Sequence, residues 1–395
     1  MVDIMRDLWR DYLVQPPADD NPESTFLPSP ADLRRKLLIK VKYTGPQVAK
    51  KRMTMTDADL EKVSSHASTD TEVEDQTPAK TKKSKIIKSL SDMGVYTRAY
   101  TFKGFDRPEA RLPSHVFSLS EGALIEAQAD NRQHVQVFEH NKVRQYQPVE
   151  ETPSINGSKQ TYMMRAYPKA LRLTSTNLNP PLFWRQGVQM AALNWQDCDK
   201  GMMINEGMFA GTGGYMLKPP SYRPGSATTT HHKQSARTLD LIIEVFAAQN
   251  LSLPADKQSD HDFHPYIKSS LHVETLEAKI GKTNTSKVSQ QPKLKLHTIH
   301  GQGRNATFST HPGHGAVLAY KNVLVDEEQL CFVRLKVVDR DRLGKDDLAA
   351  WACIRLDRLK EGLRIVRLWD AAGKGDGGLL LVRVSKVFKD EIGHV

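Results

Sequence analysis

The stretch MMRAYPKALRLTSTNLNPPLFWRQGVQMAALNW, residues 163–195, decides the fold of this chain. Two short segments have the mostly apolar composition of strands: Tyr162–Tyr167, which begins one residue before this stretch, and Val188–Asn194. Upstream, Ser120–Asn141 has helical periodicity after a Ser-Glu opening. Strands that alternate with helical segments predict βα units and a parallel sheet.

Further short strands flank this stretch on both sides. We expect them at Lys36–Lys42 (KLLIKVK), Val95–Thr101 (VYTRAYT) and Tyr215–Leu217. The strands together amount to about half of a closed barrel of the TIM type. At the start of the chain, the apolar residues of 4–12 fall at helical spacing and predict an amphipathic helix.

The last third of the chain has a different pattern. Leu239, Leu241, Ile243 and Val245 alternate with outward or polar residues, which is typical of a half-buried strand. Further strand-like runs follow at Tyr266–Glu274, Leu330–Val338, Ala350–Leu356 and Leu379–Val384. Several short strands with turn signals between them predict an antiparallel sandwich.

Two polar stretches divide these regions. Residues 46–92 place an acidic run before a basic one, which is typical of a solvated tether, with a mobile lid or an electrostatic membrane contact as the alternatives. Residues 219–238 (PPSYRPGSATTTHHKQSART) are rich in Pro, Ser and Thr and separate two domains.

Composition bounds the class of protein. A length of 395 residues favours two or three domains. No apolar run approaches the length of a membrane span, and the N-terminal sequence is not that of a signal peptide. Cys198, Cys331 and Cys353 form no CxxC pair, so we expect reduced thiols. The net charge of +10 favours nucleic acid or an anionic membrane face as partner, or a basic surface with no specific ligand.

The motifs resemble those of a eukaryotic, fungal-like phosphoinositide-specific phospholipase C. FLPSPADLRRKLLIKVKY (26–43) resembles the end of the X half of that family's barrel. The Y half is matched in order and spacing by VYTRAYTFKGF (95–105), HVFSLSEGALIEA (115–127), the stretch 163–195 and MFAGTGGYMLKPPSY (208–222). The region from about 237 to 393 is similar to the C2 domain that follows the barrel in this family.

The resemblance implies an α/β plus all-β chain: the C-terminal half of a TIM-like barrel followed by a C2 antiparallel β-sandwich. It implies these domains: 1–45, the end of the X half; 46–92, a disordered X/Y linker; 93–224, the Y half; 225–236, a linker; and 237–393, the C2 domain.

Five residues are expected to bind the substrate headgroup. Lys40 and Lys42 alternate with apolar neighbours, so both point to the same side of a strand. The resemblance assigns both lysines, together with Ser120, Arg165 and Tyr167, to the phosphorylated inositol ring. An arginine such as Arg165 suits bidentate contact with phosphate. For Ser120, the alternative role is that of a helix N-cap.

The resemblance also implies the reaction: calcium-dependent hydrolysis of phosphatidylinositol 4,5-bisphosphate to inositol trisphosphate and diacylglycerol in lipid signalling. Its two acid/base histidines and its catalytic Ca²⁺ ligands belong to X-half segments expected upstream of Met1. We therefore expect the chain to bind its substrate but to be inactive alone, as part of a longer enzyme. The alternative is a non-catalytic module that binds phosphoinositides or membranes.

The expected partners are phosphatidylinositol 4,5-bisphosphate and an anionic membrane surface, and the expected location is the cytoplasm with peripheral membrane association. The sequence contains no recognisable nucleic-acid module and identifies no protein activator.

A second Ca²⁺ site is suggested in the C2 region. VVDRDRLGKDDL places Asp339, Asp341 and Asp347 on one loop, and clustered carboxylates suit a hard cation. His264 stands where the family usually has an Asp before a Pro, so a structural β-turn is the alternative. The scattered histidines lack the paired spacing of a zinc site, and GTGG (211–214) is expected to form a turn rather than a phosphate loop.

Overall fold

The computed structural model describes most of the chain: residues 1–15, 27–43, 87–105, 107–129, 163–169, 172, 174–222, 237–273, 293–297, 303–308, 311–340 and 346–390. The chain divides into two compact units, Met1–Tyr100 and Thr101–Val395. No described helix has both the length and the apolar composition needed to cross a membrane.

The first unit contains two short helices and a short parallel ladder. Its elements are α1 (Val2–Trp9), β1 (Val41–Lys42), α2 (Lys88–Ser91) and β2 (Arg98–Tyr100). β1 and β2 pair in parallel, with Val41 opposite Arg98 and Lys42 opposite Ala99. The Arg98 guanidinium lies 4.8 Å from the centre of the Tyr43 ring. Both predicted strands are therefore present, shortened to the residues that form the ladder.

The second unit begins with a parallel sheet built from βα units, as predicted. Its elements are η2 (Pro108–Arg111), β3 (His115–Ser120), α3 (Glu121–Ala129), β4 (Met163–Tyr167), α5 (Pro180–Trp184), β5 (Met190–Ala191), α6 (Lys200–Phe209) and η3 (Pro220–Tyr222). β3 pairs in parallel with β4, and β4 pairs in parallel with β5. The carboxyl ends of these strands therefore meet at one edge.

Three predicted elements of this region differ in extent. The described part of the helix predicted at Ser120–Asn141 is α3, and residues 130–141 lie outside the described residues. The strand predicted at Val188–Asn194 is reduced to β5. The strand predicted at Tyr215–Leu217 is wrong, because this segment pairs with no described strand and both terminal side chains are 69% exposed. The predicted GTGG turn is present, with positive φ at Gly211 and Gly214.

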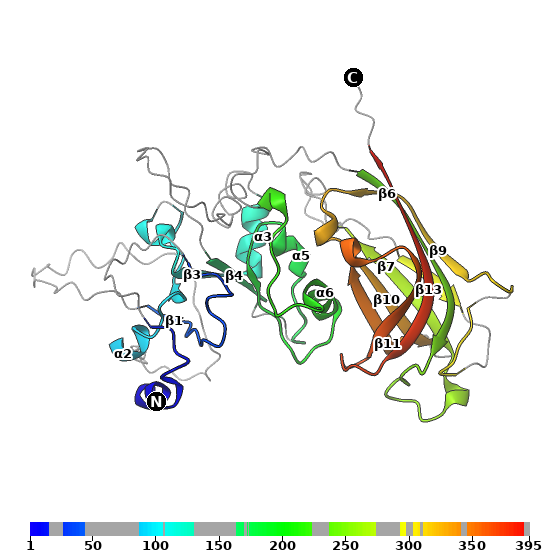
Figure 1. Ribbon diagram of the computed structural model, residues 1–395, viewed down its shortest axis with the longest axis horizontal. Helices are drawn as coiled ribbons and strands as arrows, with labels where there is room; N and C mark the ends of the chain where they lie inside the picture. Colours follow the sequence, from blue (N-terminus) through cyan, green and yellow to red (C-terminus); the bar gives the residue numbers. More distant parts are fainter. Residues whose placement is uncertain are drawn as a thin grey trace, which may run out of the picture. The chain divides into compact units, whose positions relative to one another are not determined.

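The remainder of the second unit is an antiparallel sandwich (Figure 1). Its strands are β6 (Arg237–Gln249), β7 (Pro265–His272), β8 (Lys293–His297), β9 (Ala316–Val325), β10 (Phe332–Arg340), β11 (Asp346–Arg355), β12 (Gly362–Asp370) and β13 (Gly378–Asp390), with short 3₁₀ turns η4 (Asp260–Asp262), η6 (Glu328–Leu330) and η7 (Leu356–Arg358). The hydrogen-bonded order is β8-β7-β10-β11-β12-β13-β6-β9. β11 and β12 share only two register pairs, so the chain passes there from one sheet of the sandwich to the other.

The period-two pattern of the sequence places the core of the sandwich. Leu239, Leu241, Ile243 and Val245 are at most 1% exposed and face the opposite sheet. The sequence pattern missed β8, β9 and β12. In β12, apolar residues also stand on the outside, with Leu363 55% and Ile365 67% exposed, so the strand lacks a clean alternation.

A second core joins α6 to the sandwich. Met203 and Ile204 of α6 pack in one buried cluster with Phe332 of β10 and Trp351 of β11. Phe332 also contacts Trp184, with ring centres 6.0 Å apart. The parallel region and the sandwich therefore share buried apolar surface, which is removed from water only when both are folded.

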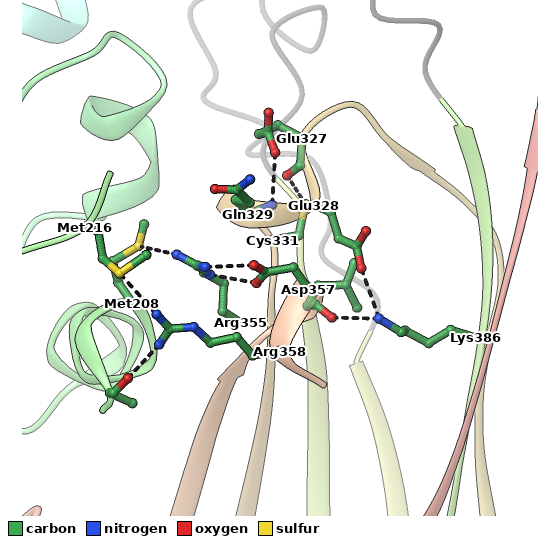
Figure 2. A network of polar contacts seen from close by, with 12 residues as sticks. Met208, Met216, Glu327, Glu328, Gln329, Cys331, Arg355, Asp357, Arg358 and Lys386 are labelled. Atoms are coloured by element: carbon green, nitrogen blue, oxygen red, sulfur yellow. Dashed lines mark hydrogen bonds and ion pairs between the residues drawn. The ribbon is translucent and has the colours of Figure 1, made fainter. Parts of the chain in front are cut away.

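Polar contacts reinforce this junction (Figure 2). Arg358 of η7 donates to the carbonyl oxygen of Ala210 at 2.6 Å. Arg355, 5% exposed, donates twice to the Asp357 carboxylate and directs Nη1 toward the Met208 sulfur at 3.6 Å. The turn after β11 therefore fastens the carboxyl end of α6 to the sandwich.

Candidate functional site

The carboxyl ends of β3 and β4 bring three of the predicted site residues together. Ser120 is the register partner of Tyr167, and Ser118 is the partner of Arg165. Met164 and Ala166 are fully buried, so the intervening Arg165 and Tyr167 share the opposite, half-buried face of β4. The predicted common orientation of these two side chains is confirmed.

Arg165 and Tyr167 also contact each other. The Arg165 guanidinium carbon lies 5.5 Å from the centre of the Tyr167 ring, in cation–π range. No carboxylate of the described residues pairs with Arg165. A planar guanidinium held against an aromatic face presents its donors in the geometry that a phosphate group accepts.

Ser120 is the last residue of β3 and lies directly before α3. Its hydroxyl accepts a hydrogen bond from the backbone amide of Ala123, with 3.3 Å between the two atoms. This contact is the N-cap role that the sequence offered as an alternative. The chain passes from strand to helix without a loop, so the amino end of α3 lies at the same edge as Arg165 and Tyr167.

Two further residues at this edge were missed by the sequence analysis. Lys169 lies across the start of α3, where a Cβ on Gly122 would be 2.7 Å from the lysine Cε. Arg172 donates through Nε and Nη2 to the two oxygens of Glu121 at 2.9 and 2.6 Å. Only the position of the lysine, two residues after Tyr167 on the same edge, was available as a signal in the sequence.

The ion pair between Glu121 and Arg172 has a structural role at this edge. Hydrogen bonding to Glu121 raises the pKa of Arg172, although partial burial acts in the other direction. Glu121 is a buried residue, with a side chain 9% exposed. Because Arg172 donates to both carboxylate oxygens, the pair fixes the segment after β4 onto the first turn of α3.

Asparagine and aspartate side chains hold the loop that follows β5. The buried Asn177 accepts from the backbone amide of Asn194 and donates to the backbone carbonyl oxygen of Asp197. Asp199 caps α6 by accepting from Gly201 and Met202. This network gives the edge next to β4 a fixed backbone.

The two predicted lysines lie in the other unit. Lys42 belongs to β1, Lys40 precedes it, and both are exposed, whereas the alternating Ile39 and Val41 are partly buried. The alternation agrees with the predicted common orientation of the two ammonium groups. Their role in headgroup binding stays a prediction.

The three carboxylates predicted to bind Ca²⁺ are only partly described. Asp341 lies outside the described residues, whereas Asp339 of β10 and Asp347 of β11 are register partners. Asp339 is 1% exposed; its Oδ1 accepts from the His264 amide at 2.8 Å, and its Oδ2 lies 3.4 Å from the Lys257 ammonium. The described residues contain no group of three His, Cys, Asp or Glu side chains arranged for a metal ion.

Among the described residues, the partners of Asp339 argue against a calcium ion at this end of the sandwich. Ca²⁺ takes six to eight oxygen ligands, but Asp339 already faces an ammonium group and an amide. The prediction of a C2 metal site at Asp339, Asp341 and Asp347 stays a prediction, and the contacts of Asp339 count against it.

The cysteines are free thiols in the structure. Cys331 and Cys353 are buried, and Cys198 is half-buried. Burial raises the pKa of Cys331 and of Cys353 to about 12, and the pKa of Cys198 to about 11. All three are therefore protonated and weakly nucleophilic near neutral pH.

Family models match three parts of the chain. The Y domain of phosphatidylinositol-specific phospholipase C matches residues 124–221, its X domain matches residues 1–43, and the C2 domain matches residues 320–369. The chain belongs to the phosphoinositide-specific phospholipase C family. This membership confirms the resemblance drawn from the motifs.

Relatives of this phospholipase C chain include fungal and animal proteins. The 1-phosphatidylinositol 4,5-bisphosphate phosphodiesterase 1 of Candida albicans is 27% identical over 417 residues, which cover 95% of this chain and 35% of the relative. The Homo sapiens protein named Inactive phospholipase C-like protein 2 is 24% identical over 383 residues, which cover 95% of this chain and 30% of the relative. The chain thus spans well under half of the length of these relatives.

Solved structures confirm the fold of this phospholipase C chain. L. pealei PLC21 superposes with a TM-score of 0.64 at 21% identity, covering 98% of this chain and 43% of the other. S. officinalis PLC21 superposes with a TM-score of 0.66 at 20% identity, covering 100% and 43%. The predicted barrel half followed by a C2 sandwich is therefore correct.

Proposed function

We propose that this chain supplies the headgroup-binding part of a phospholipase C that hydrolyses phosphatidylinositol 4,5-bisphosphate in calcium-dependent lipid signalling. The observation that carries the proposal is the arrangement of Arg165 and Tyr167 on one face of β4, beside Ser120 at the end of β3. Active sites of TIM-type barrels are built at this carboxyl edge of the strands. The Candida relative bears the name of a phosphodiesterase for that lipid.

The chemistry at this edge is that of recognition. Arginine and lysine provide positive charge for phosphate groups, and the tyrosine ring offers an apolar face to the inositol ring. Glu121 is held by Arg172 and is therefore engaged in structure. We accordingly propose that the chain by itself binds the headgroup without cleaving the lipid. For Lys40 and Lys42 of the first unit we propose binding of phosphate groups.

The C2 sandwich provides the second part of the proposal. C2 domains suit attachment to a membrane surface, and the net charge of +10 favours an anionic one. The proposed location is therefore the cytoplasmic face of a membrane, with peripheral attachment. A purely non-catalytic role is the second candidate, favoured by the 24% identity to a human protein named as inactive.

The test measures binding of soluble inositol 1,4,5-trisphosphate to the purified chain by calorimetry. Loss of a charge-assisted hydrogen bond costs roughly 1.5–3 kcal/mol, so Arg165→Ala should weaken binding roughly 10- to 100-fold. Arg165→Lys keeps the positive charge but loses the paired guanidinium donors, so its affinity should lie between those of wild type and Arg165→Ala. Arg364→Ala, an exposed arginine of the sandwich, is the control and should bind like wild type.

Vesicles complete the test. Phosphatidylcholine vesicles that contain phosphatidylinositol 4,5-bisphosphate should bind the chain more tightly than vesicles with phosphatidylserine at matched charge. No water-soluble inositol phosphate should be released in the presence of Ca²⁺. Equal binding by Arg165→Ala and wild type would overturn the headgroup site, and release of inositol phosphate would overturn the limitation to recognition.

A further inference from the structure

A buried carboxylate closes one end of the C2 sandwich. Asp339 lies near the end of β10, opposite Pro265 of β7 and Asp347 of β11, and is 1% exposed. A carboxylate removed from water in this way is strongly destabilising unless a positive charge or hydrogen bonds compensate for it. The identity of the compensating group therefore decides what this end of the sandwich requires.

The compensating charge comes from the chain itself. The Lys257 ammonium lies 3.4 Å from Asp339 Oδ2, and the Lys257 side chain is 22% exposed. Lys257 belongs to the loop between β6 and η4, far from β10 in the sequence. The other oxygen, Oδ1, accepts from the His264 amide at 2.8 Å. The pair therefore fastens the β6–β7 connection to the end of β10.

A second carboxylate at this end, that of Asp346, is also paired with a lysine. Asp346, the first residue of β11, forms an ion pair with Lys268 of β7. The Lys268 ammonium also lies 5.4 Å from the centre of the Tyr266 ring. Two of the described acidic side chains at this end are thus paired with lysines from β7 and its preceding loop.

We propose that Lys257 is a tethered cation that takes the place of a divalent ion at Asp339, so that the connection between β6 and β7 is held to the end of β10 without calcium. An ammonium group and a Ca²⁺ ion repel each other and compete for the same carboxylate. A carboxylate that already faces an ammonium group is a poor ligand for a second cation. This inference concerns the sandwich and is independent of the headgroup site.

The first experiment measures the melting temperature of the full chain in EGTA and in millimolar Ca²⁺. Wild type should melt at the same temperature in both. Lys257→Met leaves Asp339 buried and unpaired, so Tm should fall on the order of 5 °C in EGTA. Added Ca²⁺ should recover part of that loss, because the vacated space faces a carboxylate. Lys360→Met, at an exposed lysine, is the control and should show neither change.

A double variant keeps the proposal testable if Lys257→Met does not fold. Lys257→Met with Asp339→Asn removes both charges, so it should fold, melt close to wild type and ignore Ca²⁺. If the double variant is as unstable as Lys257→Met, charge compensation is not the role of the lysine and the proposal is overturned.

Membrane attachment of the C2 sandwich is part of the proposed function, and its calcium dependence is tested with phosphatidylserine vesicles and the same full chain. Sedimentation with the vesicles should be equal in EGTA and in Ca²⁺ for wild type. A rise in wild-type Tm with Ca²⁺, or a severalfold gain in vesicle binding with Ca²⁺, would overturn the proposal. Since this test contains no phosphoinositide, its failure is distinguishable from failure of the headgroup site.

Discussion

The sandwich and the parallel sheet use charged side chains differently. On the sandwich, Arg383 pairs with Glu244 at 2.8 Å and Lys386 pairs with Glu328 at 3.0 Å. At the carboxyl edge of the parallel strands, Arg165 lies against a tyrosine ring and has no carboxylate partner among the described residues. These sandwich charges are paired across the structure, whereas Arg165 contacts an aromatic ring instead of a carboxylate.

This difference follows from strand direction. In an antiparallel sheet, neighbouring strands run both ways, and cross-strand pairs of opposite charge contribute to register along the whole length. In a parallel sheet built from βα units, all strands end at one edge, so polar residues collect there. Function at the strand ends is therefore a property of the topology, and pairing along the strands is a property of the antiparallel ladder.

The largest effect is expected where the two regions share a core. Phe332→Ala removes a fully buried ring that contacts Trp184 and should cost about 3–5 kcal/mol of unfolding free energy. Urea unfolding followed by circular dichroism and tryptophan fluorescence measures the change. Because the core is shared, both signals should shift together.

A control variant and the form of the unfolding transition test whether Phe332 belongs to a core shared by both regions. The control Phe332→Leu keeps most of the volume and should cost about 1.5 kcal/mol or less. Separate transitions, with only the sandwich destabilised by Phe332→Ala, would contradict a core common to both regions.

The second-largest loss of stability is expected for a buried ion pair between the parallel region and the sandwich. Arg185, 2% exposed, donates twice to Asp326 at 2.9 Å. Asp326→Ala leaves the guanidinium buried without its counter-charge and should cost about 3 kcal/mol in urea unfolding. The comparison variant is Arg383→Ala, whose half-exposed pair with Glu244 should contribute about 0–1 kcal/mol. Equal costs for the two variants would show that burial does not distinguish the pairs.

Lys218 gives a prediction for pH. Its ammonium donates to the carbonyl oxygen of Gly187, and burial lowers its pKa from 10.5 to about 7. Between these values the unfolded chain binds a proton that the folded chain lacks, so stability rises as pH increases from about 7 toward 10. The rise should be on the order of 2 kcal/mol between pH 7 and pH 9.

The control for that prediction is Lys218→Met, which carries no proton to exchange. Unfolding free energies from urea titrations at several pH values should show a flatter profile for the variant over this range. An unchanged slope would assign the pH dependence to another group.

The smallest expected effect separates the two roles of Ser120. Ser120→Ala removes the cap of α3 and should cost about 1 kcal/mol, measured by thermal unfolding. Ser120→Asp retains the cap but places negative charge at the proposed headgroup site, so it should keep Tm and lose affinity for inositol 1,4,5-trisphosphate. Unchanged affinity in Ser120→Asp would remove Ser120 from the headgroup site.

The sequence predicted the strands whose neighbours in the chain give them a clear pattern. β6 was predicted because period-two alternation is a local signal. β12 was missed because its outward residues Leu363 and Ile365 are apolar. The strand expected at Tyr215–Leu217 failed because a strand exists only when another strand pairs with it, and no local pattern contains that information.

The candidate site divides in the same way. The common face of Arg165 and Tyr167 followed from their spacing in the sequence, because alternation fixes side-chain direction in a strand. The bond of Arg172 to Glu121 spans 51 positions and was not predicted. Partners at such separation are chosen by the packing of elements, which a single sequence does not state.

By itself, then, the sequence determined the family, the order of a parallel barrel half and an antiparallel sandwich, and the direction of the side chains on β4. Only the tertiary structure decided which charges are paired: Glu121 with Arg172, Asp326 with Arg185, and Asp339 with Lys257. The physical reason is range. Strand patterns arise from neighbours along the chain, whereas ion pairs and shared cores form between residues that only the fold brings together.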